Sequence, residues 1–303
     1  MNNKIEFETK TLQSVLQLRK LKVGNFPQEV RIENTNLCNA ACIICPREKM
    51  TRPSGIMSIN LFEKIIKEIA QHPIQSVHLQ GYGEPLIDKE FPLRIQIAKK
   101  LKISCVLFWT NASLLTPELT QSILSAGIDK IIISFYGTRQ NTYEKTMRGL
   151  DYHSTLNNIF NLFWFRKQIG MHKPSITLRY IPILEKQDSV KKFYHQFSSL
   201  ITPALGDSFN FGRLHNYGGG RDYISLKKIY STCERPWWTL MILQDGRVST
   251  CCKDFNGEQI IGNLHDDTIE NIWKGERMNQ IRHDFMAIQY QTYPVCLQCE
   301  EIY

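Results

Sequence analysis

The sequence lacks any long apolar run, because no stretch of its 303 residues reaches the roughly 18 apolar residues that a membrane span needs. It also lacks the apolar segment of a secretory signal peptide, since its first residues (MNNKIEFETKTLQ) mix charged and polar side chains. The net charge is +8, yet the sequence contains neither a basic stripe nor a known nucleic-acid-binding module. These absences predict a soluble, cytoplasmic protein with neither a membrane nor a nucleic acid as partner.

Cysteine is the informative residue type, with nine in a chain that carries no export signal. Cytosolic thiols stay reduced, so clustered cysteines there indicate metal binding or catalysis rather than disulfides. Cys105 stands apart in an apolar stretch (ISCVLFWT), where a plain core role is expected. The others form an early group and a late group, which are Cys38, Cys42 and Cys45, and Cys233, Cys251, Cys252, Cys296 and Cys299.

Hydrophobic patterning predicts alternating strands and helices between residues 30 and 212. Near-continuous apolar runs such as DKIIISF are typical of strands that are covered on both faces. Strands are expected near 30–33, 76–80, 103–109, 129–135, 175–183 and 208–212, and helices near 60–70, 88–101, 116–127, 154–169 and 188–200. About six such units predict parallel strands with right-handed crossovers, hence the fold class α/β with a partial (β/α)6 TIM-like barrel.

The pattern changes near residue 213 to a glycine-rich stretch (GRLHNYGGGRDY) followed by short strands and cysteines. We therefore expect an N-terminal extension over 1–27, a core over 28–214 and a small cysteine-rich auxiliary domain over 215–303. In parallel α/β folds the functional loops follow the carboxyl ends of the strands. The early cysteines and the segment GYGEP both follow predicted strands, so one rim of the barrel is the expected site.

The early group has the spacing CxxxCxxC on a single loop. Thiolates are soft ligands that suit iron–sulfur clusters or zinc. Three of them can hold three irons of a [4Fe–4S] cluster and leave the fourth iron open, whereas a structural zinc site needs four ligands. No further cysteine or histidine follows until His72, which favours the cluster over zinc.

This motif, placed directly after a first strand (RIENTNLCNAACIICPR), resembles the signature of the radical S-adenosylmethionine (radical SAM) superfamily. The segment GYGEP is similar to that superfamily's GGEP motif, with a tyrosine displacing one of the paired glycines. The resemblance implies that SAM is bound and reductively cleaved to a 5′-deoxyadenosyl radical, which abstracts a substrate hydrogen atom. It also implies contacts with SAM from Ile44, Gly81, Tyr82, Gly83, Glu84, Pro85, Thr110, Asn111, Ser134 and Arg179.

The late group begins with Cys-x12-Gly-x4-Cys, in which Asp245-Gly246 forms the expected hairpin turn, and ends with CxxC. It resembles the SPASM auxiliary domain in its shortened "twitch" form, with spacing similar to that of 2-deoxy-scyllo-inosamine dehydrogenases. This implies an auxiliary [4Fe–4S] cluster on Cys233, Cys251, Cys296 and Cys299. Ligand type alone leaves zinc open for the same four cysteines.

The resemblance leaves the reaction open. The substrate radical could be oxidised through the auxiliary cluster, which turns an alcohol into a ketone. Alternatively, Cys252 could return a hydrogen atom, as cysteine does in neomycin-type epimerases; a buried structural cysteine is the simpler interpretation. A peptide-modifying maturase is a third reading, although only about 28 residues precede the first strand, too few for a leader-recognition domain.

The expected partners are a small polar substrate, such as a sugar, cyclitol or aminoglycoside, and an electron donor such as flavodoxin or ferredoxin. Candidate substrate contacts near the domain junction are Arg213, His215, Tyr217 and Arg221, for which solvation in a loop is the simpler explanation. A zinc-stabilised binding protein that uses both cysteine groups structurally is the non-enzyme alternative. Substrate identity and oligomeric state do not follow from the sequence.

Overall fold

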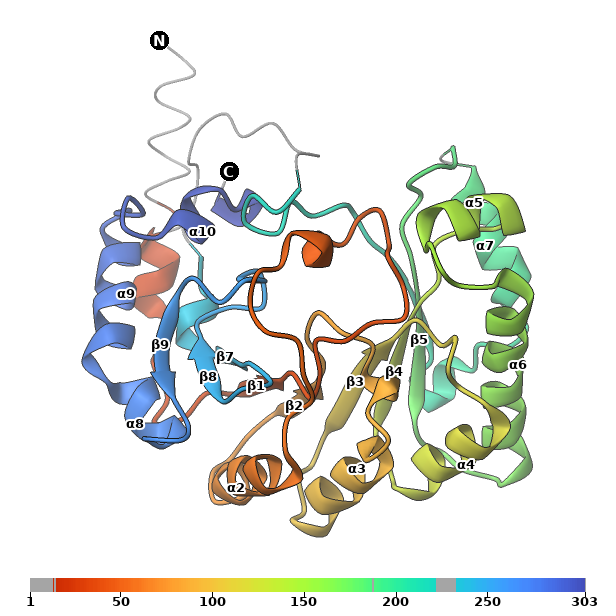
Figure 1. Cartoon of the computed structure of the whole chain (residues 1–303), viewed down its shortest axis with the longest axis horizontal. Helices are drawn as coiled ribbons and strands as arrows, with labels where there is room; N and C mark the ends of the chain where they lie inside the picture. The colour runs from red at the N-terminus through yellow and green to blue at the C-terminus, as the bar shows by residue number, and fades with distance from the viewer. Residues whose placement is uncertain (1–12, 14, 187, 222–232, 303) are drawn as a thin grey trace.

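The computed structural model describes residues 13, 15–186, 188–221 and 233–302. Residues 1–12 and 14 of the expected N-terminal extension lie outside these ranges. Along the described parts, strands and helices alternate up to residue 211, as the hydrophobic pattern predicts, and the α/β fold class is confirmed (Figure 1).

A single twisted sheet of nine strands runs through the molecule in the order β6-β5-β4-β3-β2-β1-β7-β8-β9 (Figure 1). All pairings from β6 to β7 are parallel, while β8 and β9 are antiparallel additions. The strands are β1 (Glu29–Ile32), β2 (Ser76–Leu79), β3 (Val106–Thr110), β4 (Lys130–Ser134), β5 (Ser175–Tyr180), β6 (Ser208–Phe211), β7 (Thr239–Ile242), β8 (Arg247–Ser249) and β9 (Ile260–Asn263).

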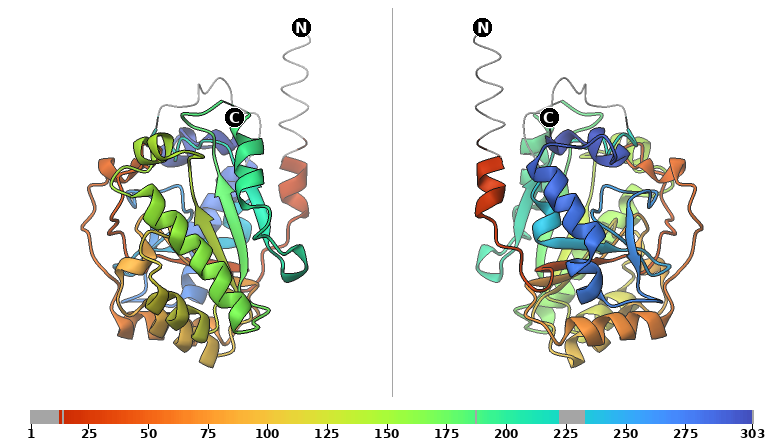
Figure 2. Two further views of the ribbon diagram at one scale, coloured as in Figure 1. Left: turned by 90° about the vertical axis from the view of Figure 1, so that its right-hand side faces the viewer. Right: turned by 90° about the vertical axis from the view of Figure 1, so that its left-hand side faces the viewer.

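Helices cover the outer side of this curved sheet, as the two side views show for α6 and α9 (Figure 2). They are α2 (Ile59–Ile69), α3 (Phe91–Lys100), α4 (Pro117–Ser125), α5 (Gln140–Thr146), α6 (Tyr152–Gln168), α7 (Ser189–Phe197), α8 (Ile269–Lys274), α9 (Glu276–Met286) and α10 (Pro294–Leu297). Within the described parts of the chain, none is long and apolar enough to cross a membrane.

Local sequence explains where these helices begin and which face they bury. The Ser58 hydroxyl accepts a hydrogen bond from the backbone N–H of Leu61 and thereby caps α2. Thr116 caps α4 in the same way, with Pro117 at the first helical position, where its missing N–H costs nothing. Ile59 at the start of α2 is partly buried, and the other apolar residues of the helix are buried; they are Leu61, Phe62, Ile65, Ile66 and Ile69.

The strand β1 lies at the centre of the sheet, and that position depends on the late part of the chain. Its residues pair with β2 on one side and with β7 on the other, so that Ile32 lies beside both Leu79 and Ile242. Val30 and Ile32 are completely buried as a result. The barrel is therefore partial. In a closed barrel the last barrel strand would pair with the free edge of β1, but here β7 pairs with that edge.

The cysteine-rich part shares the sheet instead of forming a separate core. Its β7–β8 hairpin turns at Gly246, whose φ of +87° favours glycine, in agreement with the expected Asp245-Gly246 turn. Residues 222–232, which join the two parts, lie outside the described ranges. The division near residue 215 therefore stays a prediction.

Several segments differ from the expected secondary structure: α8 and α9 lie in the cysteine-rich part, where only short strands were expected, and two further differences lie in the barrel. The helix expected from residue 88 begins only at Phe91, because Pro85–Ile87 forms a separate 3-10 turn in which the Glu84 side chain accepts from the N–H of Leu86. The short helix α5 has no clear apolar period and was not expected from the sequence. Both segments follow carboxyl ends of strands, where loop geometry is set by contacts with other loops.

Candidate active site

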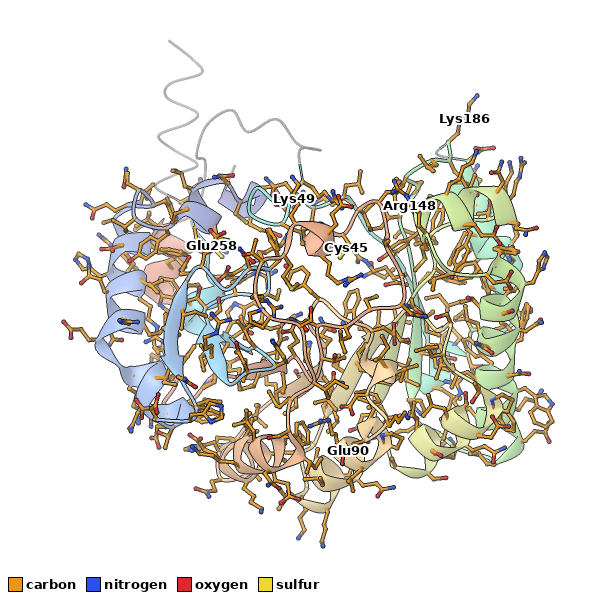
Figure 3. All side chains as sticks on the ribbon, in the orientation of Figure 1. Cys45, Lys49, Glu90, Arg148, Lys186 and Glu258 are labelled. Atoms are coloured by element: carbon orange, nitrogen blue, oxygen red, sulfur yellow. The ribbon has the colours of Figure 1, made fainter. Side chains whose placement is uncertain are left out.

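A cavity opens inside the curve of the sheet, at the carboxyl ends of its central strands. The loop that follows β1 crosses this inner side, and Figure 3 labels Cys45 on it. The cavity wall contains all three early cysteines, Cys38, Cys42 and Cys45. It also contains residues of the cysteine-rich part, so both ends of the chain build one site.

The early cysteine loop is held by backbone hydrogen bonds to the segment that follows α5. The N–H of Ala41 donates to the carbonyl of Arg148 at 2.8 Å, and the N–H of Ile43 donates to that of Thr146 at 3.0 Å. Ile44, expected to face an adenine ring, is buried and lies in the cavity wall. The thiols are therefore placed by backbone geometry.

The GYGEP segment approaches the cysteine loop so closely that its glycines cannot carry side chains. A Cβ on Gly83 would lie 2.4 Å from the carbonyl oxygen of Thr35, and one on Gly81 would lie 2.3 Å from the side chain of Glu33. Tyr82 points the other way, and its hydroxyl donates to the Cys252 carbonyl at 2.6 Å. The tyrosine that departs from the GGEP pattern thus connects this segment to the late cysteines.

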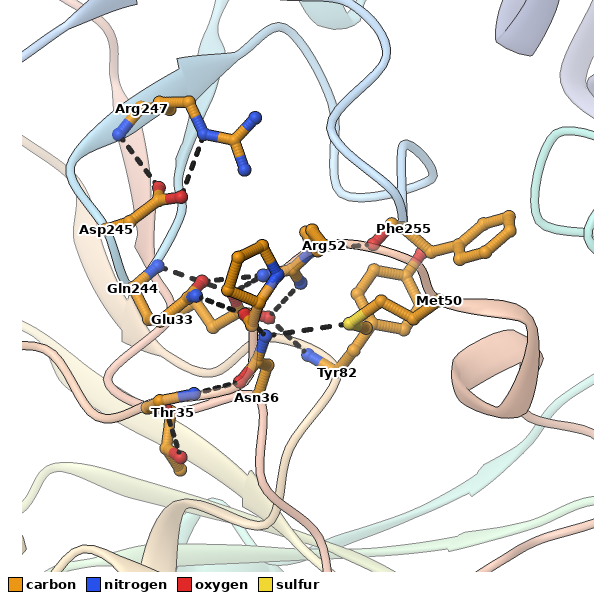
Figure 4. Close-up of polar contacts among 12 residues, drawn as sticks. Glu33, Thr35, Asn36, Met50, Arg52, Tyr82, Gln244, Asp245, Arg247 and Phe255 are labelled. Carbon is orange, nitrogen blue, oxygen red and sulfur yellow. Dashed lines mark hydrogen bonds and ion pairs between the residues drawn. The ribbon is translucent and has the colours of Figure 1, made fainter.

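A buried ion pair joins these segments. The Glu33 carboxylate accepts from both terminal nitrogens of Arg52, at 2.6 and 2.7 Å, and from the backbone N–H groups of Tyr82 and Gln244 (Figure 4). Arg52 also donates to the Gln244 side chain at 2.6 Å and to the carbonyl of Phe255 at 2.9 Å. One carboxylate thereby fixes the end of β1, the cysteine loop, GYGEP and the end of β7 together.

Glu84 is buried in the cavity wall and held at the end of β3. Its carboxylate accepts from the Thr110 hydroxyl at 2.7 Å, from the N–H of Asn111 at 2.8 Å and from the N–H of Leu86 at 3.3 Å. Burial raises the pKa of this carboxyl to about 7, although the three hydrogen bonds act to lower it. A ligand amino group at this point would favour the charged form.

The cavity brings together nearly all residues expected to contact SAM. Those in its wall are Ile44, Gly81, Tyr82, Gly83, Glu84, Thr110, Asn111, Ser134 and Arg179. Pro85 is the exception: it is buried at the start of the 3-10 turn and shapes the backbone behind Glu84. Gln80 Oε1 and Trp109 Nε1 also lie in this wall, buried and without a hydrogen-bond partner among the described residues. Such atoms fit a polar ligand that fills the cavity.

A second, smaller cavity lies beside the first, and its wall contains Cys233, Cys251, Cys296 and Cys299. These are the four residues expected to hold the auxiliary cluster, and the fifth late cysteine, Cys252, is not among its lining residues. The Cys296 thiol lies 3.4 Å from Gln259 Oε1. Burial raises the pKa of the Cys299 thiol to about 12, so thiolates here require a metal centre to stabilise them.

The spacing of the thiols distinguishes a cluster from a single metal ion. A tetrahedral zinc with four sulfur ligands at 2.3 Å places them about 3.8 Å apart. Within the described ranges, the one set of three or more potential ligand atoms that all lie within 4.8 Å of one another is His215, Glu300 and Glu301. In neither cysteine set, therefore, do three thiols all lie within 4.8 Å of one another, a spacing wider than that of a tetrahedral zinc site and compatible with a larger cluster.

Cys252 lies in the wall of the first cavity, among residues that the SAM assignment leaves free. Arg235 and Lys253 line both cavities and so form the partition between them. The Arg235 guanidinium lies 3.9 Å from the Cys252 thiol and 5.8 Å from the Trp238 ring centroid. Cys252 therefore faces the same space as the early cysteines, although it is adjacent to a residue of the second set.

The four residues near the domain junction have different positions. His215 and Tyr217 line the first cavity, whereas Arg213 is an exposed side chain that lies 4.0 Å from Glu301. Arg221 pairs with Glu48 and donates to the carbonyl of Cys45, so it braces the early cysteine loop. Of these four residues, only Arg213 is solvated in a loop, which was the simpler expectation for all of them.

His215 belongs to a compact charged group with Lys253 and Glu300. His215 Nδ1 lies 2.8 Å from Glu300 Oε1, and the Lys253 ammonium lies 2.5 Å from that oxygen. Burial by itself would raise the pKa of Glu300, but the hydrogen bonds from His215 and Lys253 lower it to about 2. Because a lysine ammonium already pairs with Glu300 and Glu301, the set with His215 is an ion-pair network and no metal site.

Sequence reasoning missed the residues that join the segments. Glu33, Arg52, Arg235 and Lys253 lie outside the motif positions, although Arg235 follows Cys233 by two residues and Lys253 follows Cys251 by two. A charged residue within two positions of a buried cysteine ligand can be recognised in the sequence as a candidate site residue, because a buried charge requires a partner of opposite charge. Glu33 carries the same signal, because it directly follows β1, in which Val30 and Ile32 are completely buried.

Comparisons with known proteins agree with this geometry. Residues 32–163 match the Radical SAM superfamily, and residues 233–300 match the iron-sulfur cluster-binding domain SPASM. The tungsten-containing aldehyde ferredoxin oxidoreductase cofactor-modifying protein of Pyrococcus furiosus is 23% identical, over 88% of this chain and 86% of its own. The S-adenosyl-L-methionine-dependent 2-deoxy-scyllo-inosamine dehydrogenase of Niallia circulans is 20% identical, over 90% of this chain and 92% of its own.

A solved structure shares the fold over almost the whole chain. The crystal structure of BtrN in complex with AdoMet and 2-DOIA has a TM-score of 0.63 and 18% identity, and it covers 90% of this chain and 92% of that one. At this identity the likeness supports the arrangement of elements, including the cysteine-rich part that follows the barrel.

We predict that replacing Arg52 with methionine destabilises the protein by about 3–5 kcal/mol, because the Glu33 carboxylate is left buried without its charge partner. Thermal unfolding of the anaerobic protein measures the loss. Arg247→Met is the matched control, since the Arg247–Asp245 pair is about one third exposed and contributes at most about 1 kcal/mol. Equal midpoints for the two variants would contradict a central role for the Glu33–Arg52 pair.

Proposed function

We propose that this chain, a radical SAM enzyme with a C-terminal SPASM domain, oxidises an alcohol group of a small polar substrate to a ketone. One observation carries the proposal: the two cysteine sets line adjacent cavities that share a wall of Arg235 and Lys253. A substrate in the first cavity would therefore lie beside the second cysteine set, as a two-step oxidation requires.

The donor sets fit the cofactors that this family uses. Cys38, Cys42 and Cys45 offer three thiolates and leave one coordination site for SAM, while the late set offers four thiolates and leaves none. When bound, the [4Fe–4S] clusters and SAM supply a 5′-deoxyadenosyl radical and an electron acceptor. An external reductant, such as flavodoxin or ferredoxin, belongs to the same proposal.

The residues assigned to SAM divide the work of positioning it. In this proposal Glu84 and the backbone of Gly83 hold the amino group and Arg179 holds the carboxylate; all three residues line the cavity. The Arg179 guanidinium is itself fixed by Asn210 Oδ1 at 2.6 Å and by the Trp109 ring at 5.4 Å. Ile44 supplies an apolar surface for the adenine.

The opposite wall of the cavity is left for the substrate. It presents polar and charged side chains, among them Arg31, His215, Arg235 and Lys253, with Met241 as an apolar exception. Such a wall suits a molecule rich in hydroxyl groups. A cyclitol or sugar is therefore the proposed class, in line with the substrate that the Niallia circulans relative's name states.

Epimerisation is the second candidate, because Cys252 lies in the cavity wall. A thiol there is placed to return a hydrogen atom to a substrate radical. Its neighbour Arg235 and the Tyr82 hydroxyl, which donates to its carbonyl, hold it in place. In this reaction the carbon centre is inverted and no net oxidation occurs.

We expect Cys42→Ala to abolish formation of 5′-deoxyadenosine from SAM and dithionite, because a cluster with two protein thiolates is not retained. Anaerobic iron and sulfide analysis should show loss of about one [4Fe–4S] cluster per chain. Cys105→Ala is the matched control, since Cys105 lies outside both cavity walls. Full activity in the Cys42 variant would refute the proposal.

The raised pKa of Glu84 predicts a pH dependence of SAM binding. Below pH 7 this carboxyl is protonated in the free protein and accepts hydrogen bonds poorly, so binding should strengthen as the pH rises from 6 to about 7. Equilibrium dialysis of labelled SAM against cluster-loaded protein measures it. Glu84→Gln should bind more weakly and lose this slope; an unchanged slope would assign the titration to another group.

Replacing Cys252 with alanine separates the two candidate reactions. A dehydrogenase should still release the ketone, within a few-fold of the wild-type rate, because its electron leaves through the late cysteine set. An epimerase should lose product inversion and the uptake of solvent deuterium at carbon. Mass spectrometry of 2-deoxy-scyllo-inosamine after incubation with the enzyme in D2O measures both ketone formation and deuterium uptake. Loss of ketone in the variant would contradict the view that Cys252 acts only in epimerisation.

A further inference from the structure

His215 is the residue of the substrate wall whose surroundings are most specific. It lies on the segment after β6, and its ring lines the first cavity with its side chain about one quarter exposed. Its Nδ1 lies 2.8 Å from Oε1 of buried Glu300. The other ring nitrogen, Nε2, makes no hydrogen bond with any residue in the described ranges.

The charges around His215 orient the ring. Glu300 accepts from the Lys253 ammonium at 2.5 Å and from the backbone N–H of Asn216 at 3.3 Å, so it is fixed behind the imidazole. Lys253 Nζ lies 3.0 Å from His215 Nδ1 and 3.3 Å from Glu301. Glu300, Glu301 and Lys253 are the other charged groups of this network. Arg213, exposed and 4.0 Å from Glu301, is a distant fourth charge.

A carboxylate behind Nδ1 has a defined consequence for Nε2. Nδ1 lies near both Glu300 Oε1 and the Lys253 ammonium, at 2.8 and 3.0 Å, so a base role requires the tautomer in which Nδ1–H donates to Glu300. In that tautomer Nε2 carries the lone pair and can accept a proton. The imidazolium that results remains paired with Glu300. Other groups on this wall are less suited: Arg31 and Arg235 are cations that cannot accept a proton, and Lys253 is committed to Glu300 and Glu301.

We propose that His215 is the general base that takes the hydroxyl proton of the substrate as the ketone forms, with Glu300 as its positioning residue. This inference rests on the proposed alcohol oxidation. The carbon first loses its hydrogen atom to the 5′-deoxyadenosyl radical. The resulting carbon radical then forms the C=O bond as the O–H bond breaks, with the proton passing to His215 Nε2 and the remaining electron to the oxidised iron–sulfur group of the late cysteine set.

The protonation state of His215 is testable without any substrate. In the oxidised holoenzyme, labelled with 15N-histidine, the resonances of His215 are identified by their absence from His215→Asn. In the neutral imidazole ring we expect the proton on Nδ1 and a free Nε2. A neutral ring with its proton on Nε2 would overturn the proposal, whether or not the protein oxidises alcohols.

Turnover distinguishes a base from a structural residue. With 2-deoxy-scyllo-inosamine deuterated at the reacting carbon, His215→Asn should still transfer deuterium to 5′-deoxyadenosine, while ketone formation falls by about 10²–10⁴-fold. The carbon radical should accumulate and be visible by electron paramagnetic resonance. Addition of imidazole to His215→Gly should restore ketone release. His195→Asn, on the exposed face of α7, is the matched control and should behave as wild type.

The outcomes separate the two levels of the proposal. If wild-type protein leaves the labelled cyclitol untouched, the proposed substrate class fails, while the tautomer of His215 still decides whether it is equipped to act as a base. If His215→Asn releases ketone at the wild-type rate, His215 is not the base. If deuterium transfer and ketone formation fall together and imidazole does not restore them, His215 is again not the base and only maintains the structure of the cavity wall.

Discussion

The site depends on one buried carboxylate, that of Glu33 at the end of the central strand. Its four hydrogen-bond donors come from the cysteine loop, from GYGEP and from the end of β7. A buried charge without its partners is costly, so these segments are stable only when all of them are in place. The early cysteine loop, GYGEP and the cysteine-rich part are therefore assembled as one unit, although Glu33 and Gln244 are 211 residues apart in the chain.

This coupling has a consequence for the reaction. The strand β7 pairs directly with β1, which places the late cysteines next to the cavity instead of on a separate, movable domain. Two cation-bearing side chains, Arg235 and Lys253, then separate the early cysteine cavity from the late one. Fixed positive charges between two anionic metal centres would lower the repulsion between these centres. The same two side chains line the first cavity, where they could also bind a polar substrate.

Much of this arrangement follows from the sequence, because local patterns determine it. The alternation of strands and helices, the caps at Ser58 and Thr116 and the turn at Gly246 are all local signals, and the structure has each of them. The separation of Cys252 from its neighbour Cys251 into two cavities is not local, since it depends on which way each side chain leaves the loop. The pairing of β7 with β1 was also inaccessible, because parallel partners that are distant in sequence leave no pattern in either strand.

Departures from the family pattern occur where the chain connects its two parts. Tyr82 replaces a glycine, and its hydroxyl donates to the Cys252 carbonyl across the cavity wall. A glycine there would leave that carbonyl unpaired and the wall open between the SAM loop and the late cysteines. The Tyr217 ring makes an edge contact with the Tyr82 ring, with 6.1 Å between the ring centroids. Tyr217 also lies next to His215 in the cavity wall. The residue that departs from the motif therefore contacts a tyrosine that lies next to the proposed base, and all three side chains line the same cavity.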